Sequence, residues 1–270
     1  MAIQENTMMK SGDLEAGENG RLYPSMTENP QRRWSFIRKV YSILAIQLLL
    51  TVAIAAIAVF VHTIPKFMLH TTLGIVLYVL TLIVPFIILC PLYAYHKQHP
   101  VNVILLMMFT IAIAFACGVV MLVFQGEEVT PYRFYNGWYV TGRIVLLAGI
   151  LTSVVVVTLT LYTFWAAKKG YDFSFLGPFL ITSLMVLIVF GLIQIFIPLG
   201  KLGSTIYGGI GAIIFSGFII YDTDNLIKRF NYDEYIWAAV CLYLDIINLF
   251  LALRDALGGG SGGSSRSTDN

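Results

Sequence analysis

Long stretches that contain no charged residue dominate this chain and restrict what it can fold into. Each has at least 20 residues, and about 20 apolar residues are enough for an α-helix to cross the ~30 Å hydrocarbon core of a bilayer. The stretches are apolar throughout rather than at alternate positions, which favours helices over a β-barrel. The six stretches are 40–61, 71–95, 101–124, 144–167, 173–199 and 202–221.

A seventh stretch, residues 235–253, is apolar apart from Asp245 and Asn248. The sequence therefore predicts an all-α polytopic membrane protein built as a bundle of seven transmembrane helices. Pro85 and Pro198 are expected to kink or end their helices, because proline has no backbone N–H to donate.

The composition agrees with a membrane protein and excludes several other classes. Hydrophobic residues make up 58% of the 270 residues and charged residues only 12%, about half the charged share of an ordinary soluble domain. The lipid bilayer is therefore the expected partner of most of the surface. A formal charge of +2, without a basic face, argues against nucleic acid. No phosphate-binding loop or nucleophile–base set is visible, so we expect neither an enzyme nor a cofactor.

Lysine and arginine are unevenly divided between the two sides of the predicted membrane domain. Eleven lie on the side of the N-terminus and six on the other, which predicts a cytoplasmic N-terminus by the positive-inside rule. Seven spans then place the C-terminus on the opposite side, and the alternative is that the helix with Asp245 inserts as a re-entrant segment. The eleven are Lys10, Arg21, Arg32, Arg33, Arg38, Lys39, Lys97, Lys168, Lys169, Lys228 and Arg229.

Both ends of the chain are expected to lie outside the membrane domain of residues 32–256. Residues 1–31 are rich in Gly, Glu, Asn and Ser and predict a disordered cytoplasmic tail. Residues 257–270 predict a flexible tail rich in Gly and Ser.

Two aspartates inside the last two apolar stretches are the most informative polar residues. A charge at the membrane centre costs about 2.5–3.5 kcal/mol even on insertion scales, so an intramembrane carboxylate points to function. The polar segment FNYDEY, residues 230–235, joins the two stretches as a hairpin. Asp222 precedes Asp233 by eleven residues, and Asp245 follows it by twelve. At 1.5 Å per residue both carboxyl groups lie ~17 Å from the turn, so the hairpin predicts a pair.

The residues beside this pair suggest what it could bind. Asn225 and Asn248 each follow an aspartate by three residues, and residues three apart share a helix face. Carboxylate and amide oxygens are ligands that calcium prefers, so a calcium site at Asp222 and Asp245 is a hypothesis. Two carboxylates in one apolar site cannot both ionise easily, which predicts a proton-sensitive pair. Alternatively, each aspartate only bonds a neighbouring helix.

Neighbouring polar and small residues have simpler interpretations. Asp224 lies four residues before Lys228, and we expect a solvated ion pair at the membrane surface. Lys228 and Arg229 are expected to be interfacial anchors. Ser204, Gly208 and Ala212 recur at four-residue spacing, which predicts close packing against another helix.

Five segments resemble the Bax-inhibitor/Lifeguard family, and its plant Lifeguard branch in particular. The resemblance covers roughly residues 33–252, because the matching blocks occur in the same order. The segments are FIRKVYSILAIQLLLT (36–51), PFIILCPLYAYHKQHPVN (85–102), LYTFWAAKKGYDFSFLGPFL (161–180), GLIQIFIPLG (191–200) and GFIIYDTDNLIKRFNYDEYIWAAVCLYLDIINLF (217–250).

The resemblance implies a seven-helix fold with a central last helix and suppression of stress-induced cell death. It also implies a pH-sensitive calcium leak that regulates calcium homeostasis through an aspartate pair, and its positions here are Asp222 and Asp245. The expected location is the endoplasmic reticulum, the Golgi, or the vacuolar or plasma membrane. Three departures stand out. Residues from about 120 to 142 look like an extra loop, which could lie in the lumen or displace the third helix. The stretch RIVLLAGILT (143–152) lacks the acidic residue that related sequences carry near Leu147, and the second apolar stretch has no arginine to neutralise the pair.

Three further hypotheses compete with the calcium leak. A non-conducting membrane protein could bind cell-death or lipid-metabolism partners through its loops and helix faces. A proton-coupled carrier would also use buried aspartates, but it predicts internal repeats with broken helices, and none is visible. An intramembrane enzyme is the weakest hypothesis, since no second catalytic set accompanies the pair.

Overall fold

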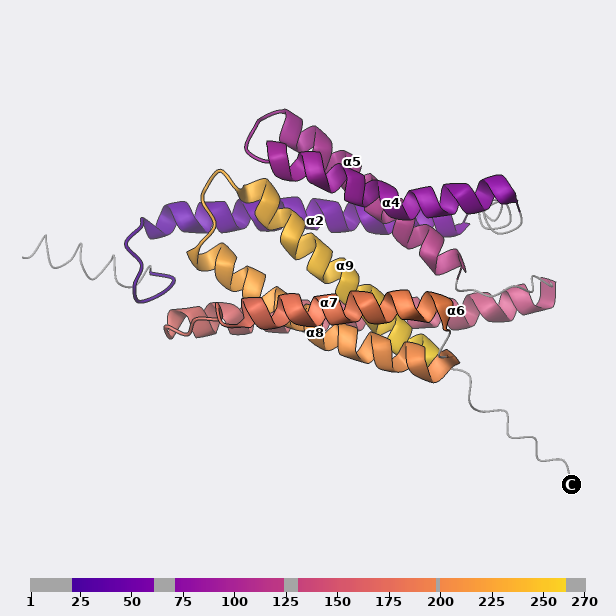
Figure 1. Ribbon diagram of the computed structural model, residues 1–270. Helices are drawn as coiled ribbons and strands as arrows, with labels where there is room; N and C mark the ends of the chain where they lie inside the picture. The colour runs from indigo at the N-terminus through magenta and orange to yellow at the C-terminus, as the bar shows by residue number, and fades with distance from the viewer. Residues whose placement is uncertain (1–20, 61–70, 124–130, 198–199, 261–270) are drawn as a thin grey trace, which may run out of the picture.

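Seven long α-helices lie side by side in the computed structural model, which describes residues 21–60, 71–123, 131–197 and 200–260 (Figure 1). All seven are long and apolar enough to cross a membrane. The predicted seven-helix bundle is therefore confirmed for the described residues. The helices are α2 (Pro30–Phe60), α4 (Thr72–Tyr95), α5 (Val101–Val123), α6 (Pro131–Lys168), α7 (Leu176–Phe196), α8 (Gly200–Lys228) and α9 (Tyr235–Gly260).

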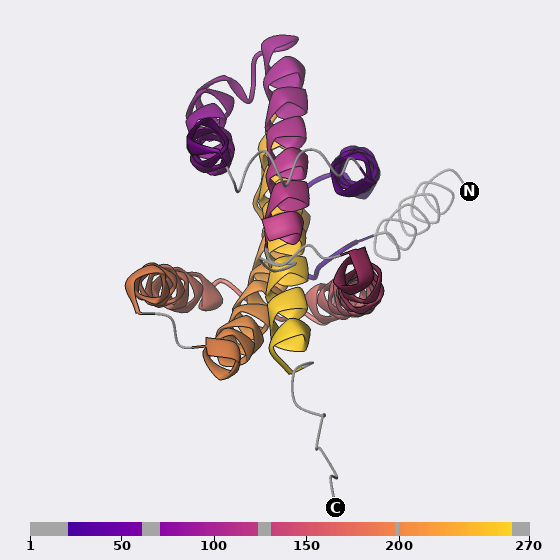
Figure 2. The ribbon, with the colours of Figure 1, turned by 90° about the vertical axis from the view of Figure 1, so that its right-hand side faces the viewer.

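The last helix, α9, lies at the centre of the bundle. It contacts α2, α5, α6 and α8, whereas α4 packs mainly on α5 and α7 mainly on α8. Figure 2 views the bundle nearly end on and shows α9 in yellow between the outer helices. Inside the bundle, 61% of the α9 span is buried, against 11% of the α4 span. Lipid therefore faces most of α4, and protein surrounds most of α9.

A few buried hydrogen bonds join helices whose contacts are otherwise apolar. Thr51 Oγ1 on α2 donates to the carbonyl of Gln47 at 2.7 Å and lies 2.7 Å from the hydroxyl of Tyr243 on α9. Gln47 Nε2 also donates to Thr110 Oγ1 on α5 at 3.1 Å. These contacts bind α2, α5 and α9 to one another, and a buried hydroxyl without a partner would be costly in this apolar setting.

Glycine allows α8 to approach α9 closely. A Cβ atom on Gly208 would lie 2.5 Å from both the carbonyl oxygen of Ala252 and the backbone nitrogen of Ala256. The two backbones therefore meet where Gly208 has no side chain, as the spacing of small residues predicts. The α8 and α9 helices form the most extensive contact between any two elements.

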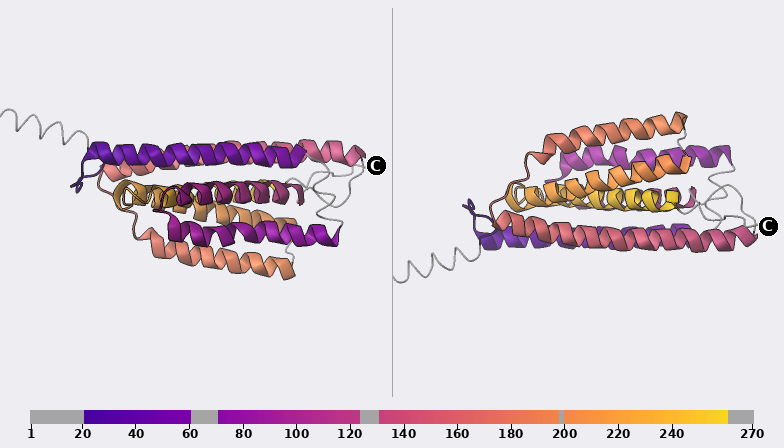
Figure 3. Two further views of the ribbon diagram at one scale, coloured as in Figure 1. Left: turned by 90° about the horizontal axis from the view of Figure 1, so that it is seen from above. Right: turned by 90° about the horizontal axis from the view of Figure 1, so that it is seen from below.

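Three connections and the start of α2 lie together at one end of the bundle, which we call the turn end (Figure 3). They are the α4–α5 turn (residues 96–100), the α6–α7 connector (residues 169–175) and the α8–α9 turn (residues 229–234). The α9 helix finishes at the opposite end. The first and last described segments therefore lie at opposite ends, as an odd number of spans requires.

A short segment before α2 packs across the turn end, and we call residues 21–29 the strap. Leu22 and Met26 are each only 6% exposed and belong to the hydrophobic core. Glu28 forms an ion pair with Arg33 at 3.0 Å and accepts a hydrogen bond from the Tyr232 hydroxyl at 2.6 Å. The strap thus connects the start of α2 with the α8–α9 turn.

The structure differs from the sequence predictions at three places. The predicted disordered tail 1–31 includes the strap and the first residues of α2, because Leu22 and Met26 find apolar partners in the core. The predicted extra loop, about 120–142, is largely helical, since α5 extends to Val123 and α6 begins at Pro131. The predicted flexible tail from 257 begins inside α9, which reaches Gly260. Residues 1–20, 124–130 and 261–270 lie outside the described residues.

Pro85 does not end its helix. Pro85 is buried inside α4, which continues through Pro91 to Tyr95. Pro198 lies outside the described residues, and α7 ends before it at Phe196.

Candidate functional site

The two intramembrane aspartates meet between α8 and α9. The side chains of Asp222 and Asp245 lie within hydrogen-bonding reach of each other. Asp245 is buried at 7% exposure, and Asp222 is partly buried. A carboxylate only accepts hydrogen bonds, so a hydrogen bond between two carboxyl groups requires one proton between them.

The hairpin explains why two residues 23 positions apart in the sequence come together. The α8 helix ends at Lys228 and α9 begins at Tyr235, so only six residues separate the helices. The backbone N–H and the Nδ2 of Asn231 both donate to Glu234 Oε2, at 3.0 and 3.2 Å, and close the turn. The helices then run antiparallel, and equal distances from the turn give equal depths.

The two asparagines play different parts in this arrangement. Asn225 Nδ2 donates to Asp222 Oδ1 at 3.5 Å, so the amide offers the carboxylate an N–H rather than an oxygen. Asn225 Oδ1 instead accepts from Arg229 at 2.7 Å. Asn248 Nδ2 donates to the backbone carbonyl of Leu244 on its own helix at 2.8 Å. Of the two predicted supporting residues, Asn225 therefore contacts the pair through a side-chain hydrogen bond, and Asn248 bonds the backbone of its own helix.

Asp224 forms the predicted ion pair, but not at a solvated surface. Its carboxylate lies 2.5 Å from Lys228 Nζ and has no exposure. It also accepts a hydrogen bond from the backbone N–H of Phe173, 3.3 Å away in the α6–α7 connector. Helical spacing alone could not reveal this burial, because the segment that covers Asp224 is 51 residues away in the sequence.

Arg229 is the functional candidate that the sequence prediction missed. We expected an interfacial anchor, but its NH1 reaches Asn225 and its NH2 donates to Asp172 Oδ1 at 2.7 Å. The Asp172 partner lies in the α6–α7 connector, 57 residues earlier. No local pattern in the sequence signals a contact over that separation.

Two carboxylates at the turn end, Asp172 and Glu234, have contacts that favour their charged forms. Burial works to raise the pKa of Asp172, but hydrogen bonds from Ser174 and the nearby Arg229 guanidinium outweigh it and lower the pKa. The backbone N–H of Asn231 lowers the pKa of Glu234, and the Lys97 ammonium, 2.9 Å away, adds to the effect. Both side chains are therefore ionised near neutral pH.

The pair itself offers hard oxygen ligands for a cation. Asp245 Oδ2 is buried and accepts no hydrogen bond in the described part of the chain, so this oxygen is available. Calcium favours six to eight oxygen ligands, and no group of three or more His, Cys, Asp or Glu side chains gathers among the described residues. The geometry fits a transient cation contact between two carboxylates better than a closed metal site.

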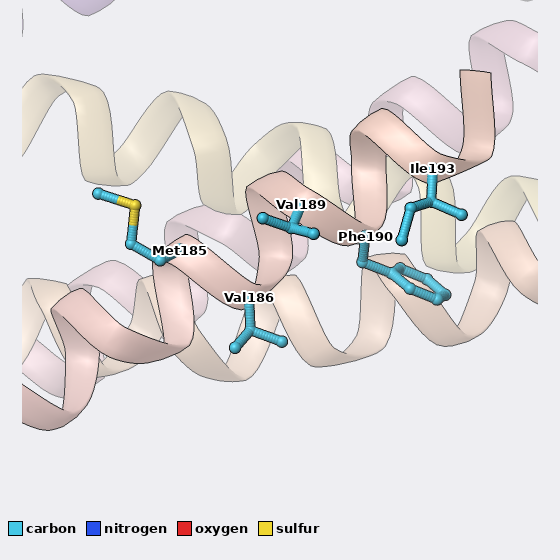
Figure 4. Close-up of a pocket in the computed structure, with 5 residues that line it drawn as sticks. All are labelled: Met185, Val186, Val189, Phe190 and Ile193. Atoms are coloured by element: carbon cyan, nitrogen blue, oxygen red, sulfur yellow. The ribbon is translucent and has the colours of Figure 1, made fainter. Parts of the chain in front are cut away.

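A shallow hollow on the outside of the bundle offers no comparable polar site. Figure 4 shows this shallow hollow on α7, and its lining residues are all apolar. Four of them are exposed on this outer helix, where lipid is the expected neighbour, and Phe190 stacks on Tyr207 of α8. The lining residues are Met185, Val186, Val189, Phe190 and Ile193.

Comparisons with known proteins agree with this fold. The family model described as "Inhibitor of apoptosis-promoting Bax1" matches residues 33–262. Protein LIFEGUARD 4 of Arabidopsis thaliana is 55% identical over 251 residues, which are 92% of this chain and 95% of that protein. Protein LIFEGUARD 2 of the same plant is 56% identical over 245 residues, 91% and 95% of the two chains. The Golgi anti-apoptotic protein of vaccinia virus (strain Lister) is 34% identical over 234 residues, 83% and 85% of the two chains.

Proposed function

The chain belongs to the Bax-inhibitor/Lifeguard family, and on that premise we propose that it suppresses cell death by acting as a pH-sensitive calcium leak. The observation that carries this proposal is the contact between the carboxyl groups of Asp222 and Asp245 inside two membrane-spanning helices. The names of the relatives support cell-death suppression in general. The Golgi anti-apoptotic protein of vaccinia virus supports an endomembrane location.

The pair acts as a proton-sensitive latch between α8 and α9. While one proton is shared, the two carboxyl groups attract each other and hold the helices together at that depth. When the proton is lost, two negative charges lie side by side in an apolar setting, and they repel strongly because little solvent screens them. A calcium ion that arrives there finds two carboxylates at once, including the free Oδ2 of Asp245.

The release of calcium from a membrane store follows from this arrangement. A leak lowers the calcium content of the compartment and so weakens death signals that depend on calcium release. We place the turn end on the cytoplasmic side, because the majority of lysines and arginines lies there and the positive-inside rule applies. The expected membranes are the endoplasmic reticulum, the Golgi, or the vacuolar or plasma membrane.

Calcium flux in proteoliposomes tests this function directly. The full chain is reconstituted with a calcium-sensitive dye inside, and the initial rate is measured at two pH values. We expect the wild-type rate to differ between them and the rate ratio to return to one in the double variant Asp222→Asn plus Asp245→Asn. The matched control is Asp233→Asn, which removes a carboxylate that is exposed in the α8–α9 turn.

If the double variant keeps the wild-type flux and pH dependence, the aspartate pair does not control the leak and the proposed latch is wrong. Cell-death suppression then decides between the leak and a non-conducting interaction protein. Suppression that survives the loss of both aspartates, but fails when exposed residues of the turn end are changed, supports the interaction protein.

A further inference from the structure

We propose that Asp172, Arg229 and Asn225 form a chain of polar contacts that positions Asp222 from the α6–α7 connector. The three residues are positioning residues, because none of them is a member of the aspartate pair. These contacts begin at the surface of the turn end and reach into the membrane-spanning part of α8. The contacts therefore connect the aspartate pair to a segment that is exposed outside the bilayer.

Each link of the chain is a specific contact. Arg229 NH2 donates to Asp172 Oδ1 at 2.7 Å, and Arg229 NH1 donates to Asn225 Oδ1 at 2.7 Å. The guanidinium presents both donors in one rigid plane, so a fixed Asp172 also fixes the amide of Asn225. With its oxygen held by Arg229, Asn225 turns its NH₂ group toward Asp222 Oδ1, 3.5 Å away.

The α6–α7 connector has a fixed position against α8, because other contacts that do not involve Arg229 hold it there. The backbone N–H of Phe173 donates to the fully buried Asp224 at 3.3 Å. Lys228 Nζ pairs with Asp224 and also donates to the carbonyl oxygen of Tyr171 at 2.5 Å. Asp172 lies between these two anchored residues and accepts hydrogen bonds from the backbone N–H and hydroxyl of Ser174, at 3.1 and 3.0 Å.

A consequence for the leak follows, and this part rests on the proposed function. In the described part of the chain, Asn225 is the residue outside the pair that hydrogen-bonds Asp222. A connector that is displaced withdraws Arg229, leaves Asn225 free to rotate, and loosens the hold on Asp222. The α6–α7 connector is therefore the element through which the cytoplasmic side biases the latch.

Thermal unfolding of the whole protein tests these polar contacts without any flux measurement. Arg229 and Asp222 make no direct hydrogen bond, so their effects on Tm should be additive unless the contacts between them transmit a coupling. The variants are Arg229→Met, Asp222→Ala and their combination. The matched control is Lys97→Met, which breaks an exposed ion pair at the same end of the bundle that does not involve Asn225.

We expect the Tm loss of the Arg229→Met plus Asp222→Ala variant to be smaller than the sum of the single losses. Lys97→Met plus Asp222→Ala should be additive. The same set of variants is then made in a protein that also carries Asn225→Ala, and the coupling between Arg229 and Asp222 should disappear. Additive losses for Arg229 and Asp222 overturn the proposal. A coupling that survives Asn225→Ala overturns it too, because it is then a through-space effect of charge.

Calcium flux provides a second readout. Asp172→Asn and Arg229→Met should both raise the basal rate by a similar factor, roughly two- to tenfold for one lost hydrogen bond, whereas Lys97→Met should not. If all three variants and the wild type have the same basal calcium flux, the connector does not influence the leak. If the wild-type protein conducts no calcium, the proposed function fails, and the Tm cycle still decides whether the chain of contacts exists.

Discussion

Tyr243 of the central helix donates a hydrogen bond to Thr51 of α2 on the side of α9 that faces away from the aspartate pair. The oxygens lie 2.7 Å apart, and the direction follows because the Thr51 hydroxyl already donates to the carbonyl of Gln47. Tyr243 and Asp245 are two positions apart, which places them on roughly opposite sides of a helix, about 200° around its axis. The contact therefore fixes the rotation of α9 that directs Asp245 toward α8.

Loss of the acceptor at Thr51 should destabilise the bundle. Thr51→Val keeps the shape but leaves the buried Tyr243 hydroxyl without a partner, at a cost of about 1–3 kcal/mol. Thr51→Ser keeps the acceptor and should lose much less. Tm in detergent micelles measures both. Equal losses in the two variants would show that the hydroxyl contributes nothing beyond packing.

Glycine at position 208 should be required for the α8–α9 contact. A methyl group in Gly208→Ala would meet backbone atoms of α9 at 2.5 Å, and overpacking of this kind costs about 1–3 kcal/mol. The matched control is Gly209→Ala, because no atom lies within 4 Å of a Cβ at Gly209. Thermal unfolding should show a lower Tm only for Gly208→Ala. A loss of equal size in both variants contradicts the close approach.

Removal of one partner from the buried ion pair should cost more than removal of both. Asp224→Asn leaves the Lys228 ammonium beside a neutral side chain, and the expected loss is about 2 kcal/mol or more. In Asp224→Asn plus Lys228→Gln, no uncompensated charge remains, and Tm should recover in part. A double variant that is less stable than the single variant would contradict the buried pairing.

Glu234 should stabilise the turn end at neutral pH and lose this effect in acid. Its pKa in the folded protein is lowered from the ordinary value of 4.5 by the N–H of Asn231 and then by Lys97. A lowered pKa means that the stabilisation is fully present above the unfolded value and disappears as pH falls through the folded value.

The Tm difference between the wild type and Glu234→Gln is the measurement. Because Glu234 and Lys97 are partly exposed, we expect a small difference, roughly 2 °C or less. It should be constant above pH 4.5 and shrink below it. Asp233→Asn, which leaves the contacts of Glu234 intact, serves as the control. A difference that grows in acid would contradict the assigned pKa direction.

Local sequence patterns predicted the helices and the meeting of Asp222 with Asp245, because both depend on short-range rules. Apolar length defines a span, and a hairpin with a six-residue turn leaves little freedom in depth. The spacing of small residues predicted the close approach at Gly208 for the same reason. The role of the aspartate pair in calcium or proton sensing stays a prediction.

Contacts between distant segments were beyond the sequence analysis. The burial of Asp224 depends on the connector residue Phe173, and the position of Arg229 depends on Asp172. Leu22 and Met26 lie in a polar segment whose composition suggests a tail, but their apolar side chains pack into the core. Composition averages over a segment, whereas packing depends on individual side chains.

The strap also constrains the order in which the protein is completed during synthesis. Arg33 NH1 donates to the carbonyl of Phe230 at 2.6 Å, across 197 positions of the chain, and the strap residue Glu28 bonds Tyr232. Chains emerge from the ribosome with the N-terminus first. The strap is therefore made before the α8–α9 turn, which supplies part of its docking surface and follows all the described helices except α9. Until the α8–α9 turn has been made, Glu28 lacks the Tyr232 partner that ties the strap to the last helical hairpin.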